Sequence, residues 1–190
     1  MERIVLASQS PRRKQLLEWA EIEFDIIVKE TDESWPSNLS TDEIPVHIAR
    51  NKALAVQSEL SLPRIILAAD TVVVIDDEII GKPSGREEAI EMISRLSGNK
   101  HIVITGVVIL HNGMETHFSD LTEVWFHPLH RDEITWYVDR YKPYDKAGAY
   151  AIQEWIGVTG IKKICGDFYN VMGLPVSRVV NALKRIEEGN

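Results

Sequence analysis

Residues 4–13 read Ile4-Val5-Leu6-Ala7-Ser8-Gln9-Ser10-Pro11-Arg12-Arg13, an apolar strand that runs directly into the start of a helix. Ser10 is suited to cap that helix, and Pro11 to its first position, where the missing N–H costs nothing. The free N–H groups of the first turn and the positive end of the helix dipole then face the carboxyl edge of the strand. With Arg12 and Arg13 at that edge, the stretch predicts a phosphate site. A capped helix with two solvated arginines is the alternative interpretation.

Strand and helix patterns alternate along the rest of the chain, which predicts an α/β fold with a mixed sheet. Strands are expected at 4–7, 24–28, 65–75, 79–80, 101–110, 115–126 and 166–171, and helices at 11–19, 41–61, 86–96, 132–141 and 175–186. The dipeptide Asn112-Gly113 is a strong signal for a hairpin between two long strands. No repeat, low-complexity tract or linker divides the chain, so residues 1–190 are expected to form a single domain.

The composition narrows the class of protein. The chain has 190 residues, 44% hydrophobic and 26% charged, which are ordinary values for a globular protein with a core. No apolar stretch approaches the roughly 20 residues that cross a bilayer, and no signal pattern opens the chain, so we expect a cytoplasmic protein without a membrane partner. A net charge of −8 without a basic stripe disfavours nucleic acid but allows a small polyphosphate. Cys165 is the only cysteine, which excludes an internal disulfide.

Asp70 interrupts the apolar run of residues 65–75. A charged side chain is costly in such a strand unless it is paired, binds a metal or lies at an exposed strand end. Asp70 is therefore either a carboxylate satisfied by backbone donors at a bulge or strand end, or a catalytic group that binds a metal or activates water. Glu33 could supply a second metal oxygen, and Lys52 and Lys82 are candidate cations. Such oxygen ligands favour a hard ion, Mg²⁺ or Mn²⁺.

The segment from Tyr144 to Gln153 contains the small residues Ala147-Gly148-Ala149, which allow another backbone or a ligand to come close. The amide of Gln153 both donates and accepts hydrogen bonds, so it can match the O4 and N3–H edge of uracil or thymine. A tight turn before a strand explains the same residues without a ligand. The sequence leaves these two interpretations open.

Five motifs, in order along the chain, resemble the Maf family of nucleoside triphosphate pyrophosphatases, historically named as septum-formation inhibitors. They are Ser8–Arg13, Ala69-Asp70-Thr71, Gly81-Lys82-Pro83, Asp145–Gln153 and Asn170–Pro175. The resemblance implies an elongated mixed β-sheet flanked by helices, with two lobes around a cleft, similar to inosine-triphosphate pyrophosphatase. It also implies hydrolysis between the α- and β-phosphates, with a divalent cation, to a nucleoside monophosphate and diphosphate.

The resemblance assigns roles to individual residues. Asp70 is similar to the proton acceptor of the family, and Glu33 with Asp70 to its metal site. The residues similar to its phosphate contacts are Ser8, Arg13, Lys52 and Lys82. Those that match the specificity trio of the subfamily preferring dTTP and UTP are Arg12, Thr71 and Gln153.

Two departures and two alternatives accompany the resemblance. Gln9 replaces the usual small residue or arginine of the opening motif, and the insertion-like residues 154–157 follow Gln153, where they could reshape a base pocket. The sister subfamily that acts on 7-methyl-GTP is one alternative, and a non-catalytic nucleotide-binding regulator of septum formation is the other. The resemblance implies a nucleotide partner and allows a homodimer, and clearance of non-standard nucleotides is a role compatible with it.

Overall fold

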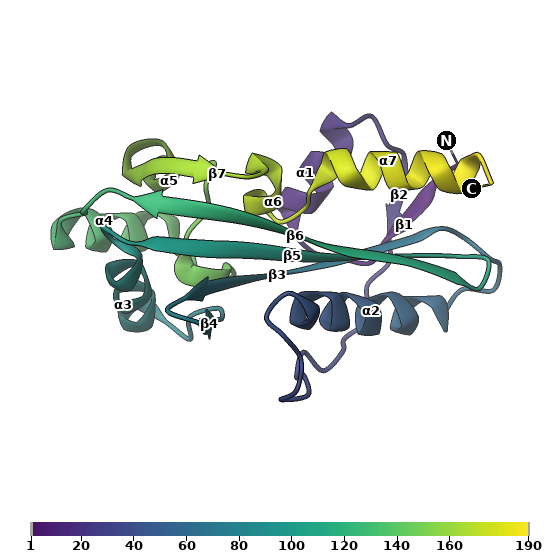
Figure 1. Cartoon of the computed structure of the whole chain (residues 1–190), viewed down its shortest axis with the longest axis horizontal. Coiled ribbons are helices and arrows are strands. Elements are labelled where there is room, and N and C mark those ends of the chain that lie inside the picture. The colour runs from purple at the N-terminus through teal and green to yellow at the C-terminus, as the bar shows by residue number, and fades with distance from the viewer. Residues whose placement is uncertain (1, 190) are drawn as a thin grey trace. The chain divides into compact units, whose positions relative to one another are not determined.

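A mixed β-sheet forms the framework of residues 2–189, the part of the chain that the computed structural model describes (Figure 1). Its strands are β1 (Ile4–Leu6), β2 (Phe24–Ile26), β3 (Ile66–Ile75), β4 (Glu78–Ile80), β5 (Lys100–His111), β6 (Met114–Phe126) and β7 (Ile161–Cys165). They are ordered β2-β1-β3-β5-β6-β7, with β4 beside β3. Strand β1 runs parallel to β2 and β3, whereas β4 and β7 are antiparallel to their neighbours. The mixed sheet expected from the sequence is thus confirmed.

The longer helices follow the strands as the sequence pattern predicts, whereas the short helices Trp155–Gly160 and Phe168–Met172 were not predicted. They are α1 (Pro11–Trp19), α2 (Glu43–Gln57), α3 (Arg86–Leu96), α4 (Arg131–Tyr141), α5 (Trp155–Gly160), α6 (Phe168–Met172) and α7 (Val176–Glu187). Helix α2 is shorter than the expected range of 41–61. None of the helices between residues 2 and 189 has the length and apolar character to span a bilayer.

The expected strand at 166–171 is wrong. The strand precedes that range as β7, and Phe168–Met172 is a short helix instead. Gly166, with φ of 130°, turns the chain away from the strand direction directly after Cys165. The two outer lysines of β7, Lys162 and Lys163, are exposed, as is typical of an edge strand, so this strand shows little of the apolar signal on which the prediction depended.

The chain divides into two compact units. The first unit contains the chain up to Asp70, Thr105–Asp120 and the chain from Gly173 onward, and the second contains Thr71–Ile104 and Leu121–Met172. The boundaries fall within β3, β5 and β6, so these three strands each contribute residues to both units. The prediction of a single domain therefore depends on whether the two units fold as one.

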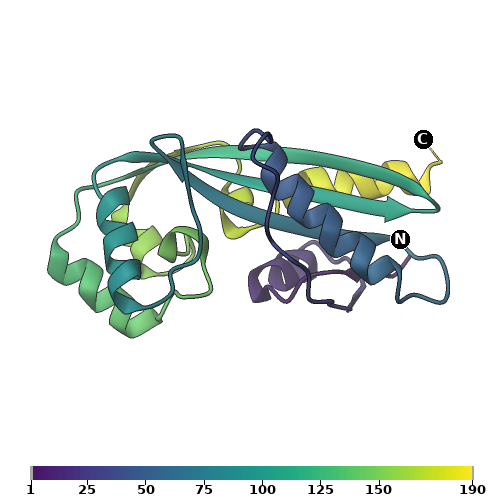
Figure 2. The ribbon, with the colours of Figure 1, turned by 90° about the horizontal axis from the view of Figure 1, so that it is seen from below.

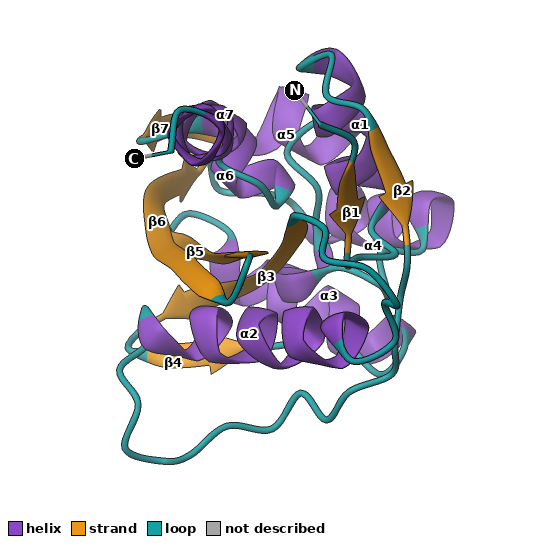
Figure 3. Cartoon of the chain, turned by 90° about the vertical axis from the view of Figure 1, so that its right-hand side faces the viewer, coloured by secondary structure: helices purple, strands orange, loops and turns teal. Residues whose placement is uncertain are grey.

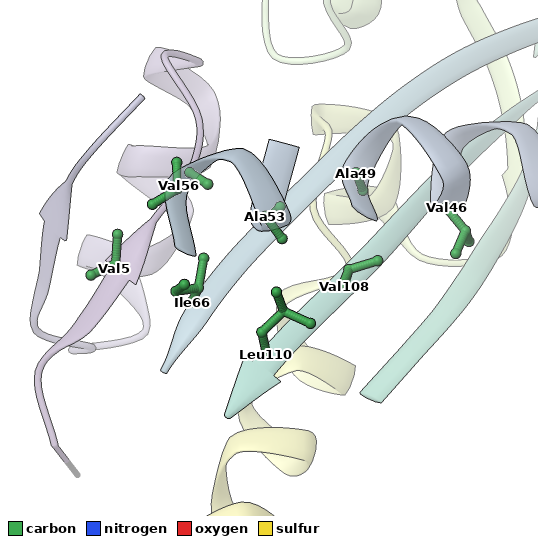
Figure 4. Packing of buried hydrophobic residues seen from close by; sticks show 10 residues of the cluster. Val5, Val46, Ala49, Ala53, Val56, Ile66, Val108 and Leu110 are labelled. Atoms are coloured by element: carbon green, nitrogen blue, oxygen red, sulfur yellow. The ribbon is translucent and has the colours of Figure 1, made fainter. Parts of the chain in front are cut away.

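The core of the first unit lies between α2 and the sheet (Figure 4). Ala49 and Ala53 of α2 are fully buried in a cluster with aliphatic side chains of β1, β3 and β5, so the helix lies close to the strands. A Cβ atom on Gly106 of β5 would collide with the backbone of Pro45-Val46, which explains why glycine stands at this approach. Helix α7 covers the opposite face of the strands in this unit (Figure 3).

In the second unit, α3 and α4 pack against each other (Figure 2). Arg86 of α3 joins Asp139 of α4 through its Nε, 2.6 Å from Oδ1. Tyr137 of α4 is fully buried and stacks on Tyr141, with ring centroids 4.9 Å apart. The loop with Gly148 is tied to the loop with Gly81, since the Gly148 N–H donates to the Gly81 carbonyl at 3.0 Å.

Candidate functional site

Three charged side chains from separate elements meet in the first unit. Lys52, on α2, places its Nζ 2.7 Å from Oδ1 of Asp70 and 2.7 Å from Oε1 of Glu33. The side chains of Lys52 and Asp70 are 17% and 14% exposed, whereas that of Glu33, in the loop after β2, is 48% exposed. The cluster is therefore mostly buried at Lys52 and Asp70 and accessible to solvent at Glu33.

Asp70 lies within the continuous strand β3, so the interpretation as a carboxylate at the end of that strand is wrong. The parallel pairing of β1 with β3 ends where Leu6 faces Leu67, and Asp70 follows three residues later. Asp70 is therefore placed just beyond the carboxyl end of β1, at the edge of the sheet from which the loop to α1 departs. Its carboxylate is stabilised there by the ammonium of Lys52.

The loop from β1 to α1 has the capped geometry that its sequence predicts. Ser10 is the N-cap of α1, with its Oγ 3.5 Å from the N–H of Arg13, and Pro11 occupies the first helical turn. Arg13 is not a solvated surface residue, because it is only 8% exposed. Its Nε donates to the carbonyl of Gly173 at 2.7 Å, and its Nη1 donates to Oγ of Ser8 at 3.1 Å. The surface interpretation of this arginine is therefore wrong.

The charge of Arg13 belongs to the same site as the carboxylates. Burial lowers the pKa of Arg13, and the nearby positive charge of Arg12 lowers it as well, while Asp70 and Glu33 act in the opposite direction. A guanidinium stays protonated under all these influences. The site therefore presents the cations of Lys52 and Arg13 beside two carboxylates.

The remaining predicted residues belong to the second unit. Thr71 directly follows Asp70 on β3 and is half-buried, whereas Lys82 and Gln153 are exposed. The bond from Gly148 to Gly81 brings the loop of Lys82 beside the segment that leads to Gln153. The structure thus gathers Ser8, Arg12, Arg13, Glu33, Lys52 and Asp70 in one unit, and Thr71, Lys82 and Gln153 in the other.

The carboxylates of Glu33 and Asp70 are the residues that could hold a divalent cation. Both lie 2.7 Å from the same Nζ, so their nearest oxygens are within twice that distance of each other. Within residues 2–189, no group of three or more histidine, cysteine or acidic side chains is placed to hold a metal. Mg²⁺ is usually held by one or two carboxylates together with substrate phosphates and water. The pair fits such an ion when a triphosphate supplies the other oxygens.

The structure also places polar residues to which the sequence assigned no role. Lys146 is only 8% exposed, and its Nζ lies 2.8 Å from Asp145 and 3.6 Å from Glu154. The hydroxyl of the buried Tyr137 donates to the other oxygen of Glu154. A lysine beside three small residues was visible in the sequence, but its partner Glu154 and the tyrosine could not be inferred from that spacing.

Comparison with known proteins decides the family. The family model described as Maf-like protein matches residues 3–186. The chain belongs to the Maf family. A Maf relative from Cytophaga hutchinsonii, named dTTP/UTP pyrophosphatase, is 51% identical over 183 residues, which cover 96% of this chain and 84% of that protein. Proteins with the same name from Bacteroides thetaiotaomicron (44% identity, 96% and 95% covered) and Porphyromonas gingivalis (47% identity, 99% and 96% covered) are also similar.

Solved structures similar to this Maf chain have lower identity. A nucleoside-triphosphatase / dITP/XTP pyrophosphatase from Mycobacterium abscessus is 12% identical with a TM-score of 0.40, over 66% of this chain and 73% of that one. The Ham1 protein of Staphylococcus aureus is 17% identical with a TM-score of 0.44, over 66% and 72%.

Proposed function

We propose that this Maf protein hydrolyses nucleoside triphosphates between the α- and β-phosphates, with dTTP and UTP as its preferred substrates. The observation that carries the proposal is the contact of Lys52 with both Asp70 and Glu33, beside the buried Arg13. This arrangement places cations that can bind phosphates next to a carboxylate that can activate water. The relatives named dTTP/UTP pyrophosphatase, which match over nearly the whole chain, support the substrate class.

The cations of the site are suited to bind the triphosphate. Arg13 is oriented by the carbonyl of Gly173 and the hydroxyl of Ser8, so little side-chain entropy remains to be lost on binding. Lys52 can donate to a phosphate oxygen while it keeps a carboxylate partner, since its ammonium has three donors. We assign Ser8, Arg13, Lys52 and Lys82 as phosphate contacts.

Asp70 acts as the general base in this proposal. Its carboxylate takes a proton from a water molecule, the water oxygen bonds to a phosphorus of the α–β anhydride, and the bridging P–O bond breaks. The nucleoside monophosphate and pyrophosphate are released. Such a positioned base typically accelerates a reaction about 10²–10⁴-fold.

Glu33 and Asp70 would hold a divalent cation, Mg²⁺ or Mn²⁺. When bound, the ion offsets the negative charge of the triphosphate and polarises phosphoryl oxygens. The chain carries a net charge of −8, so an additional positive charge favours the approach of a polyanion. The residues assigned here provide only one carboxylate pair for the ion, which is consistent with an ion that arrives together with the nucleotide.

The base is read by Arg12, Thr71 and Gln153 in our proposal. The amide of Gln153 can pair with O4 and N3–H of thymine or uracil, whereas cytosine presents an N4 donor and an unprotonated N3. An amide can flip to serve cytosine, so Gln153 predicts a preference and not an exclusion. Purine triphosphates are expected to be poorer substrates because their bases are larger.

A turnover panel tests the proposal. Purified protein is incubated with dTTP, UTP, CTP, 7-methyl-GTP, ATP and GTP, with excess chelator or after restoration of Mg²⁺ or Mn²⁺. We expect pyrophosphate and monophosphate from dTTP and UTP, less from CTP, and no turnover in chelator. Faster turnover of 7-methyl-GTP would assign the chain to the sister subfamily. Nucleotide binding without any pyrophosphate release would favour the non-catalytic regulator.

A further inference from the structure

Gln153 lies at the tip of a tight turn in the second unit. The turn spans Ala151–Glu154 and is closed by a hydrogen bond from the Glu154 N–H to the Ala151 carbonyl, 3.1 Å long. Ile152 is buried and Gln153 is exposed. The direction in which Gln153 points is therefore set by the backbone of this turn.

The hydroxyl of Tyr137 joins the two ends of that turn. It accepts a hydrogen bond from the N–H of Ala151 at 3.3 Å and donates its own proton to Oε2 of Glu154. Burial raises the pKa of Tyr137, and the adjacent carboxylate of Glu154 raises it further, so the hydroxyl keeps the proton that it donates. The phenol reaches the turn from α4, which precedes the turn in the chain.

Lys146 approaches the same carboxylate from its other oxygen. Its Nζ lies 3.6 Å from Oε1 of Glu154 and 2.8 Å from Asp145. On the far side of the turn, a Cβ on Gly157 would collide with the carbonyl of Ile152, so the start of α5 packs directly on the turn backbone. The turn is thus held by hydrogen bonds at both ends and by backbone contact at its middle.

We infer that Tyr137, Glu154 and Lys146 form a brace that positions Gln153 and thereby determines base specificity. The inference rests on the proposed role of Gln153 in base reading. The ring of Tyr137 is already buried and stacked on Tyr141, so the hydroxyl is not needed to bury the side chain. A mostly buried carboxylate and ammonium contribute little net stability, whereas they can select one conformation. Discrimination between bases by hydrogen bonds requires that the donor and acceptor groups be held within about 0.5 Å of the positions at which they pair with the base.

The variant Tyr137→Phe tests the brace, because it removes only the hydroxyl. We expect the ratio of kcat/KM for dTTP over CTP to fall several-fold, and by no more than in Gln153→Ala. The matched control is Tyr150→Phe, which removes the hydroxyl of another buried tyrosine, one that contacts Nε2 of His101 at 2.7 Å. This control is expected to leave the dTTP:CTP ratio at its wild-type value even if it lowers the thermal midpoint.

Two further variants separate positioning from general destabilisation. Glu154→Gln keeps an acceptor for Tyr137 but removes the charge that faces Lys146, and a smaller fall of the ratio is expected. The double variant Tyr137→Phe with Gln153→Ala should have the same dTTP:CTP ratio of kcat/KM as Gln153→Ala alone, because the brace has no amide left to position. A purely structural role of Tyr137 would instead lower turnover of both substrates equally and leave their ratio unchanged.

Amide hydrogen exchange of nucleotide-free protein provides a readout that does not depend on activity. The peptide covering residues 151–157 should exchange faster in Tyr137→Phe than in the wild type, and not in Tyr150→Phe. Unchanged exchange in Tyr137→Phe overturns the brace. In a further outcome, Tyr137→Phe exchanges faster and yet keeps the wild-type dTTP:CTP ratio, although Gln153→Ala changes that ratio. This outcome would leave the brace in place but overturn its role in positioning Gln153. An unchanged ratio in Gln153→Ala overturns base reading by Gln153 and, with it, the specificity role of the brace.

Discussion

At the scale of single residues, short polar contacts hold the charged side chains of the first unit in place. Arg13 is directed by a backbone carbonyl of Gly173, and the ammonium of Lys52 is shared between Asp70 and Glu33. Removing one partner of such a contact leaves the other partly desolvated and uncompensated. Substitutions here should therefore preserve shape and change one chemical property at a time.

Asp70→Asn is expected to keep the fold and lose most activity. An amide oxygen can still accept from Lys52, but an amide cannot act as a base, so kcat with dTTP should fall about 10²–10⁴-fold. Steady-state kinetics and the thermal midpoint are measured side by side. Asp42→Asn, at an exposed position before α2, serves as the control. Near-wild-type turnover of a folded Asp70→Asn protein would end the assignment of Asp70 as the base.

Lys52→Gln is expected to increase the affinity for Mn²⁺ in nucleotide-free protein. The ammonium lies between the two carboxylates and repels a cation there, so its removal should tighten binding about fivefold, the equivalent of roughly 1 kcal/mol. Titration calorimetry measures the affinity, and turnover should fall because a phosphate contact is lost. Lys29→Gln, which breaks the exposed pair with Glu59, should change neither quantity. Weaker Mn²⁺ binding in Lys52→Gln would contradict a metal site at this pair.

Contacts between elements create a pH-sensitive point in the second unit. His101 of β5 meets Phe126 of β6 and Tyr150 in edge-to-face contacts, with ring centroids 5.3 and 5.4 Å from its own. Burial lowers the pKa of His101 from 6.5 to about 4. The packing of two strands and a loop around this ring therefore keeps it neutral where an unfolded chain would be protonated.

The free energy of unfolding should consequently fall as the pH is lowered from about 6.5 to about 4. In that window the unfolded chain binds a proton at His101 that the folded chain does not bind, so protonation favours unfolding, by up to about 3 kcal/mol at the acid end. Urea unfolding between pH 4 and 7.5 measures this slope. His101→Phe should reduce the difference in proton uptake between the unfolded and folded chains by about one proton. His127→Phe, at an exposed position, should leave the slope unchanged. Equal slopes in wild type and His101→Phe would refute the prediction.

At the scale of the whole molecule, two compact units share three strands. Strands β3, β5 and β6 each continue from one unit into the other, so the two units are joined by the backbone of the same three strands. We therefore keep the prediction that residues 1–190 act as a single Maf-like domain. The residues proposed to contact phosphates and base are likewise divided between the units.

Urea unfolding is expected to show one cooperative transition. Tryptophans report on each unit, since Trp19 and Trp35 lie in the first and Trp125, Trp136 and Trp155 in the second. Fluorescence of variants that retain tryptophans in one unit only should give the same midpoint as far-UV circular dichroism. Two separated midpoints would show that the units fold independently.

The sequence by itself determined most of the elements and the identity of the chemical groups. The cap at Ser10 and Pro11, the turn at Asn112-Gly113 and the apolar strand around Asp70 each depend on residues only a few positions apart. Such local patterns persist in any fold that uses them, and the helix start, the hairpin and the strand were therefore predicted correctly. The short helix at Phe168–Met172 was not, because five residues carry too little periodicity.

Only the tertiary structure decided which groups meet. Arg13 contacts a carbonyl 160 residues away, Lys52 contacts a carboxylate 18 residues away, and Tyr137 reaches a turn 14 residues away. No local spacing encodes these contacts, because they exist only after apolar faces have packed and brought the elements together. The same packing buries Arg13 and His101 and so sets their pKa shifts, since the cost of desolvating a charge depends on what surrounds it in space.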